Sequence, residues 1–226
     1  MKLIFLCLVL ILTGWKAEAQ HVNAYFRTAS YYTVIYTGKE EIKYPLSILN
    51  DPYLYTKEYK EGTLLYDGVL YPDVKLRLNG HKEELVVLSP DGRFNIIVPT
   101  ERVGYATIGD LFIFYNISAT GINALPDGYY VRLHNGKYPV LKRETCIIQS
   151  KPKETKVEES FVRSNRLYVL KDGKYNQIRN KSNILKLFKS EKKALKRFIK
   201  EKELNFKNAP DDFVAAVAKH YETLAP

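Results

Sequence analysis

Residues that could bind a metal ion or act as a general base are sparse in this chain of 226 residues. The histidines are scattered along the chain: His21, His81, His134 and His220. No two of them have the i, i+4 spacing that puts two ligands on one helix face, and no neighbouring cysteines accompany them. We therefore predict no metal site and no cofactor, and we interpret His134, beside the Asn135-Gly136 turn, as a surface residue.

Nucleophilic catalysis has one candidate group, the thiol of Cys146. It lies in the apolar run TCII at residues 145–148, which is typical of a strand, so we interpret Cys146 as a buried thiol. The adjacent carboxylates Glu83 and Glu84 would point to opposite faces of a strand and could not easily share a substrate. A hydrolase that uses dispersed carboxylates or Cys146 remains an alternative, because only the fold assembles such a site.

Tyrosines are crowded into the first third of the chain, where an exposed row of rings could stack on sugars or form a protein-binding surface. Tyrosine is also common in half-buried strands, which gives many of these rings a packing role. Strands do not account for the density over residues 44–59, because Pro45 and Pro52 predict a loop there. The candidate ligand-binding residues are Tyr44, Tyr53, Tyr55 and Tyr59.

The positive charge of the chain is concentrated near its C-terminus. Residues 171–200, here called the basic arm, contain eleven lysines and arginines and two acidic residues, against a net charge of +10 for the whole chain. The arm could contact an anionic surface, or it could be a solvated helix face, because Glu191, Glu201 and Glu203 alternate with its lysines. The candidate contacts are Lys189, Lys192, Lys193, Lys196, Arg197 and Lys200.

The rest of the pattern predicts the elements that position these residues. Over residues 25–179, apolar residues recur with a period of two. The runs are separated by Asp67-Gly68, Asp91-Gly92, Asn135-Gly136 and Asp172-Gly173. Such dipeptides supply the positive φ angles that two-residue hairpins need. We predict a mainly β (α+β) fold: an antiparallel meander that forms a curled sheet or open barrel, with an exposed loop at residues 151–160.

After the meander, the apolar spacing becomes helical. Ser182 is the predicted N-cap of a first helix, and Ser190 divides the pattern that follows into a short and a longer helix. Pro210, followed by Asp211 and Asp212, marks the start of a last helix, because proline and acidic residues favour a first helical turn. We predict a C-terminal helical hairpin.

The N-terminus has the three parts of a cleaved signal peptide. Lys2 gives a positive start, residues 3–12 are apolar, and Ala17-Glu18-Ala19 has the small-x-small pattern of a cleavage site. The apolar run is too short to span a bilayer, and we predict no transmembrane span in the mature chain. The predicted parts are a signal peptide at 1–19, a β domain at 20–180 and a basic helical appendage at 181–226.

Three features together resemble a group of exported proteins of Bacteroidota that has no assigned activity, and the first is the end of the signal pattern at Ala19-Gln20. Residues 62–74 read GTLLYDGVLYPDV and are followed by EELVV at 83–87. Residues 167–175 read LYVLKDGKY, before a lysine-rich helix that reaches FIK at 198–200. The resemblance runs from about residue 62 to the C-terminus. It implies a protein of the periplasm, the outer membrane or the outside of the cell, and it supplies no site residues.

These patterns together favour a non-enzymatic exported envelope protein that acts as a binding module for a protein or a surface glycan. We expect no nucleic-acid partner, because an exported protein does not meet the nucleic acid of the cell. Two alternatives stay open. One is a hydrolase that acts on envelope glycan or peptide, and the other is peripheral docking of the basic arm to an anionic surface.

Overall fold

The computed structural model describes residues 33–116, 125–154 and 156–224. The predicted signal peptide at 1–19 and His21 lie outside the described residues. The strands are β1 (Lys39–Glu40), β2 (Tyr53–Leu54), β3 (Lys60–Tyr66), β4 (Val69–Asn79), β5 (Glu84–Leu88), β6 (Asn95–Ile97), β7 (Val103–Ile108), β8 (Leu111–Asn116), β9 (Gly128–His134), β10 (Val140–Lys153), β11 (Lys156–Lys171) and β12 (Lys174–Ile178). The helices are α2 (Lys181–Leu187), α3 (Lys192–Glu201) and α4 (Pro210–Leu224), with short 3-10 turns η1 (Val34–Tyr36), η2 (Thr100–Arg102) and η4 (Lys189–Glu191).

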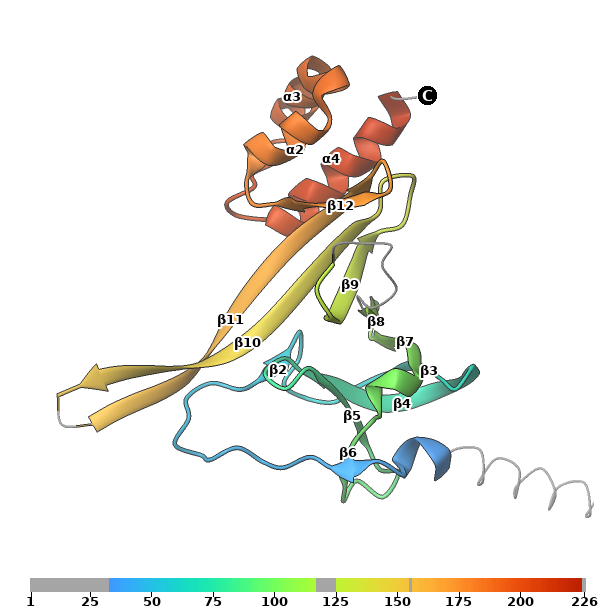
Figure 1. Cartoon of the computed structure of the whole chain (residues 1–226), viewed down its shortest axis with the longest axis vertical. Coiled ribbons are helices and arrows are strands. Elements are labelled where there is room, and N and C mark those ends of the chain that lie inside the picture. The colour runs from blue at the N-terminus through green and yellow to red at the C-terminus, as the bar shows by residue number, and fades with distance from the viewer. Residues whose placement is uncertain (1–32, 117–124, 155, 225–226) are drawn as a thin grey trace, which may run out of the picture.

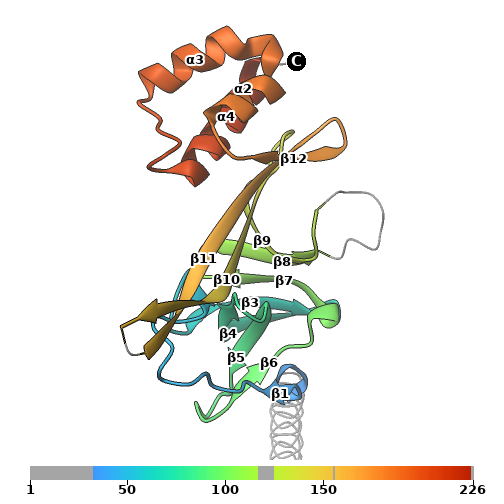
Figure 2. The ribbon, with the colours of Figure 1, turned by 60° about the vertical axis from the view of Figure 1, so that its left-hand side comes forward.

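The strands form one antiparallel sheet, in the order β1-β6-β5-β4-β3-β7-β8-β9-β10-β11-β12, with β2 paired to β4. Most neighbours in the sheet are also neighbours along the chain, as short turns require. The sheet curls without closing, and α2, α3 and α4 lie at its β12 end (Figures 1 and 2). The predicted mainly β meander with C-terminal helices is confirmed.

Two of the four predicted turn dipeptides have the geometry of a two-residue hairpin. Their four residues have φ between 50° and 74°: Asp67, Gly68, Asp172 and Gly173. The Asn135-Gly136 turn differs, because neither residue has a positive φ and five residues separate β9 from β10. The absence of a Cβ atom at Gly136 instead lets the carboxylate of Glu222 approach the turn closely.

Residues 151–160 are largely exposed, as predicted, but the prediction that they form a loop is wrong. This stretch is the tip of the long β10–β11 hairpin, whose strands pair in one unbroken register. Pro152 does not break the pairing of β10 with β11. Leu170 donates its N–H to the Pro139 carbonyl, and the backbone groups of successive residues then alternate between facing β11 and facing away from it. By this alternation the backbone of Pro152 faces the outer edge of β10, where no N–H is needed for pairing with β11. The tip projects from the body (Figure 1) and is surrounded by solvent. This exposure explains its polar sequence.

The larger of the two main buried clusters packs β2–β8 together with parts of β9, β10 and β11. Phe161 and Cys146 fasten the long hairpin to this core. Cys146 is 2% exposed in β10, and burial raises the pKa of its thiol despite the nearby positive charge of Arg163. The prediction of a buried strand thiol is therefore confirmed, and the raised pKa disfavours the reactive thiolate.

The second cluster joins α2, α3 and α4, here called the helical cap, to β10, β11 and β12. Asn180, rather than the predicted Ser182, caps α2, because its side chain accepts from the N–H of Asn183. As predicted, a first helix, α2, ends before Ser190, and the last helix, α4, begins at Pro210. Within the described ranges, no helix combines the length and the apolar character needed to cross a membrane. The domain division at residue 180 stays a prediction.

Candidate binding site at the sheet edge

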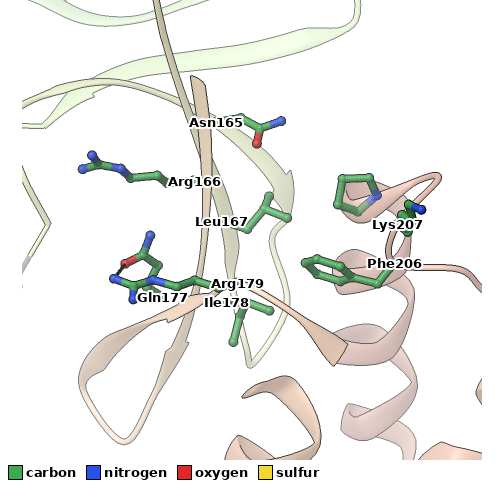
Figure 3. Close-up of a pocket in the computed structure, with 9 residues that line it drawn as sticks. Asn165, Arg166, Leu167, Gln177, Ile178, Arg179, Phe206 and Lys207 are labelled. Atoms are coloured by element: carbon green, nitrogen blue, oxygen red, sulfur yellow. Dashed lines mark hydrogen bonds between the residues drawn. The ribbon is translucent and has the colours of Figure 1, made fainter. Parts of the chain in front are cut away.

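A pocket opens where the end of β12 meets β11 and the start of α4 (Figure 3). Its volume is about 410 Å³. It is lined by Asn165, Arg166, Leu167, Gln177, Ile178, Arg179, Phe206, Lys207 and Pro210, here called the basic pocket. These residues come from three separate segments, so the pocket exists only because the helical cap folds back onto β11 and β12.

Three cationic side chains border the basic pocket: Arg166, Arg179 and Lys207. All three residues are exposed, and none forms an ion pair within the described part of the chain. Arg179 donates from Nη2 to the amide oxygen of Gln177 at 3.0 Å, which orients its guanidinium. No carboxylate is among the lining residues, so the local potential favours an anionic ligand.

The floor of the basic pocket is apolar and continuous with the core of the helical cap. Leu167 and Ile178 lie opposite each other across β11 and β12, and each is 3% exposed. Phe206 packs edge-on against Phe213 of α4, with ring centroids 5.5 Å apart. A fixed apolar floor with a charged rim suits a ligand that carries both an anionic and an apolar group.

The backbone edge of β11 is open beside this pocket. β12 covers that edge only as far as Leu167. Farther along, Leu49 meets the same edge, where it accepts from the Phe161 N–H at 3.0 Å and donates to the Glu159 carbonyl at 2.9 Å. Between these two contacts, at residues 163–165, no strand of the described chain pairs with it. An unpaired edge can pair with another chain.

The chemistry available in the basic pocket is recognition. Its lining has arginine, lysine, amide, aliphatic and aromatic side chains, with no serine, cysteine, histidine or carboxylate among them. Arginine and lysine bind carboxylates and phosphates through charge-assisted hydrogen bonds. Among residues 33–116, 125–154 and 156–224, no group of histidine, cysteine and acidic side chains could hold a metal ion.

Two of the predicted ligand-binding tyrosines, Tyr53 and Tyr59, hold a cation of the protein itself. Their ring centroids lie 3.7 Å and 4.3 Å from the guanidinium carbon of Arg77. The Tyr59 hydroxyl donates to the side-chain oxygen of Asn95 at 2.8 Å, and burial raises the pKa of Tyr59 to about 12. Both rings therefore have a packing partner, and their role in ligand binding stays a prediction.

A buried carboxylate, Glu41, pairs with the Arg77 guanidinium that lies against these two rings. It accepts hydrogen bonds from Arg77 Nη2 at 2.8 Å, from Asn79 Nδ2 at 3.0 Å and from the Tyr53 hydroxyl at 3.1 Å. The side chain of Glu41 is 1% exposed and that of Arg77 is 13% exposed. The network therefore fastens the segment before β2 to β4 through a charge pair that is shielded from water.

The other two predicted tyrosines lie against different neighbours. The Tyr44 ring packs edge-on against His81 and Phe161, with centroids 5.6 Å and 5.0 Å away. The Tyr55 ring lies 5.6 Å from the ammonium of Lys142, and burial raises the pKa of its hydroxyl. The fold thus brings Tyr53 and Tyr59 together around Arg77 and gives Tyr44 and Tyr55 separate surroundings.

The predicted contacts of the basic arm all reach solvent: Lys189, Lys192, Lys193, Lys196, Arg197 and Lys200. Arg197 lies 3.7 Å from Glu201, and the other five form no ion pair within the described chain. Lys192 and Lys196 also line a hollow of about 380 Å³ between α2 and α3, together with Lys181, Ser182 and Leu185. The fold therefore gathers three lysines on one concave surface.

The described histidines have three unrelated environments. The prediction of His134 as a surface residue is wrong, because its side chain is 16% exposed and its Nε2 lies 2.8 Å from the Glu222 carboxylate. Burial opposes ionisation of Glu222, but hydrogen bonds from the Tyr138 N–H and His134 outweigh it and lower the pKa of Glu222. His81 Nδ1 lies 3.2 Å from a backbone carbonyl, and His220 stacks on a phenylalanine ring 3.8 Å away.

The sequence alone does not reveal the basic pocket. It places Arg179 only within the basic arm, and it singles out neither Arg166 nor Lys207. The one local signal is the polar pair Asn165-Arg166 just before the apolar run at 167–170. That pair indicates a binding site only when the strand register shows that β12 ends opposite Leu167 and leaves Asn165 and Arg166 beyond its end.

Two surfaces of the described chain indicate what the protein could bind: the basic pocket and the basic arm. Their side chains favour binding of anions. Comparison of the chain with known protein families, with curated proteins and with solved structures found no match.

Proposed function

We propose that the protein is a non-enzymatic binding module that recognises an acidic segment of a protein partner in the basic pocket. The observation that carries this proposal is the lining of the basic pocket, which combines the cations Arg166, Arg179 and Lys207 with apolar residues and contains no acidic residue. A carboxylate of the partner would gain charge-assisted hydrogen bonds there, while an apolar neighbour would cover Phe206. An acidic glycan would meet the same cations but would leave the apolar floor less well covered.

We also propose that the protein works outside the cytoplasm. The signal-peptide pattern at residues 1–19 and the resemblance to exported Bacteroidota proteins support this compartment. The partner is then a protein of the cell envelope, and the protein itself is periplasmic, outer-membrane-associated or secreted.

Selection from a randomised octapeptide library displayed on phage tests the binding site directly, because it samples acidic, basic and apolar ligands alike. We expect the selected peptides to be rich in aspartate and glutamate. The double variant Arg166→Gln, Arg179→Gln should bind a selected peptide about 30-fold more weakly, because each partly exposed ionic contact is worth about 1 kcal/mol. Affinity is measured by fluorescence anisotropy of the labelled peptide.

The matched control is Lys60→Gln, Lys75→Gln, which removes the same charge from exposed positions of β3 and β4. It should keep the affinity of the unmodified protein within about twofold, since screened charges far from the pocket contribute little. A library that yields no binding peptide, or equal weakening by both double variants, would contradict the proposed function.

A second candidate function is docking of the basic arm to an anionic surface. The observation that favours it is the concave surface formed by Lys181, Lys192 and Lys196. Each lysine near an anionic bilayer contributes about 1 kcal/mol of attraction. The bilayer and the peptide would use separate surfaces, because no residue lines both hollows.

Sedimentation with vesicles tests this second function. The variant Lys181→Gln, Lys192→Gln, Lys196→Gln should bind vesicles that contain phosphatidylglycerol about 100-fold more weakly than the unmodified protein. The control Lys43→Gln, Lys57→Gln, Lys60→Gln changes three exposed lysines elsewhere. Binding that is equal at low and high salt would rule out electrostatic docking.

A further inference from the structure

The open edge of β11 presents backbone groups at Arg163 and Asn165. Leu170 donates its N–H to the Pro139 carbonyl, so even-numbered residues of β11 face β10. Phe161 donates in the opposite direction, to the segment before β2, as the alternation requires. Because the β10–β11 register is unbroken, the N–H and C=O groups of residues 163 and 165 face outward.

This open edge has the length of a short strand. It runs from Phe161, where Leu49 pairs, to Leu167, where β12 pairs. Residues 162–166 between them extend over about 16 Å, at about 3.3 Å per residue. At one end Arg163 donates to the Tyr53 carbonyl at 2.6 Å, and at the other end Asn165 lines the basic pocket.

We propose that the acidic segment of the partner is an extended peptide that adds to β11 as a short strand across Asn165, in the gap left by the end of β12. The inference rests on the proposed function, because the same basic pocket then receives the side chains of the added strand. Strand addition supplies affinity through main-chain hydrogen bonds and specificity through pockets for alternate side chains.

The two sides of the edge differ in chemistry, and this difference predicts the ligand pattern. Arg166 and Arg179 lie on one side of β11, whereas Leu167 and Phe206 lie on the other (Figure 3). Successive side chains of a strand point to opposite faces. A peptide that alternates acidic and apolar residues would therefore place carboxylates beside the arginines and apolar groups over the floor.

An N-methyl scan of a selected octapeptide tests this geometry. Methylation removes one backbone N–H at a time without changing any side chain. In strand addition, only alternate residues of the peptide direct their N–H toward β11. We expect methylation at those positions to weaken binding about tenfold or more and methylation at the intervening positions to weaken it less than about threefold.

Hydrogen exchange of the protein gives an independent readout. Saturation with the unmethylated peptide should slow exchange of the Asn165 amide about tenfold or more, because its N–H gains an acceptor. The Ser164 amide, which already faces β10, serves as the internal control and should change little. No alternation in the scan and no protection of Asn165 would overturn strand addition, while loss of binding in the Arg166, Arg179 variant would still support anion recognition.

Discussion

Arg77→Met should lower the free energy of unfolding by about 3–5 kcal/mol. The substitution leaves the carboxylate of Glu41 without its cation in a site where that side chain is 1% exposed. It also removes the guanidinium that lies against the rings of Tyr53 and Tyr59. Denaturant unfolding followed by circular dichroism measures the loss.

Two further variants separate this buried pair from ordinary charge effects. Arg93→Met breaks an ion pair whose arginine is 76% exposed, and it should cost less than about 1 kcal/mol. The double variant Glu41→Gln, Arg77→Met should recover part of the loss, because it removes both charges. A cost for Arg77→Met as small as that for Arg93→Met would show that Glu41 is not a buried, paired charge.

Phe188→Ala should lower the free energy of unfolding by about 3–5 kcal/mol as well, through the cavity that it leaves. Phe188 is fully buried in the core of the helical cap. Its ring stacks on Tyr221 with centroids 4.0 Å apart and meets Tyr138 edge-on at 5.3 Å. Denaturant unfolding measures the change, and affinity for a selected acidic peptide should fall with it, because the same core positions Phe206.

The control for this prediction is Phe94→Ala, which removes the same ring from a position that is 47% exposed. It should cost less than about 1 kcal/mol and leave peptide affinity unchanged, because Phe94 lies between β5 and β6, far along the sheet from the cap. Equal destabilisation by the two substitutions would contradict the packing described for the helical cap.

Features set by local chemistry can be predicted from this sequence. Asp67-Gly68 and Asp172-Gly173 form tight hairpins because both residues of each pair adopt the positive φ that the turn requires. Pro210 begins α4 because it lacks the N–H that a first turn leaves unpaired anyway. In each case the residues that determine the local structure are neighbours in the chain, so a sequence pattern can predict it.

The errors arise where distant residues decide the outcome. Residues 151–160 look like a loop because they are polar, yet they pair with each other and are polar because both faces of the hairpin tip meet water. His134 sits beside a turn dipeptide but is covered by Glu222, a residue of α4. A local sequence pattern does not show which distant residue will pair with it or pack against it.

The basic pocket could not be predicted for the same reason. Its cations come from β11, from the end of β12 and from the segment before α4, and only tertiary packing brings them together. The tyrosines that the sequence singles out belong instead to other contacts, such as those of Tyr53 and Tyr59 with Arg77. Clusters of one residue type are visible in a sequence, whereas a mixed pocket is not.

Amide chemical-shift mapping of a selected acidic peptide onto the isotopically labelled protein tests the basic pocket most directly. The largest changes are expected at Asn165, Gln177, Arg179 and Lys207. At a peptide concentration near the dissociation constant of the unmodified protein, they should almost disappear in the Arg166→Gln, Arg179→Gln variant. Changes confined to the segment from Tyr44 to Tyr59, or changes that persist in the variant, would contradict the assignment of the basic pocket as the binding site.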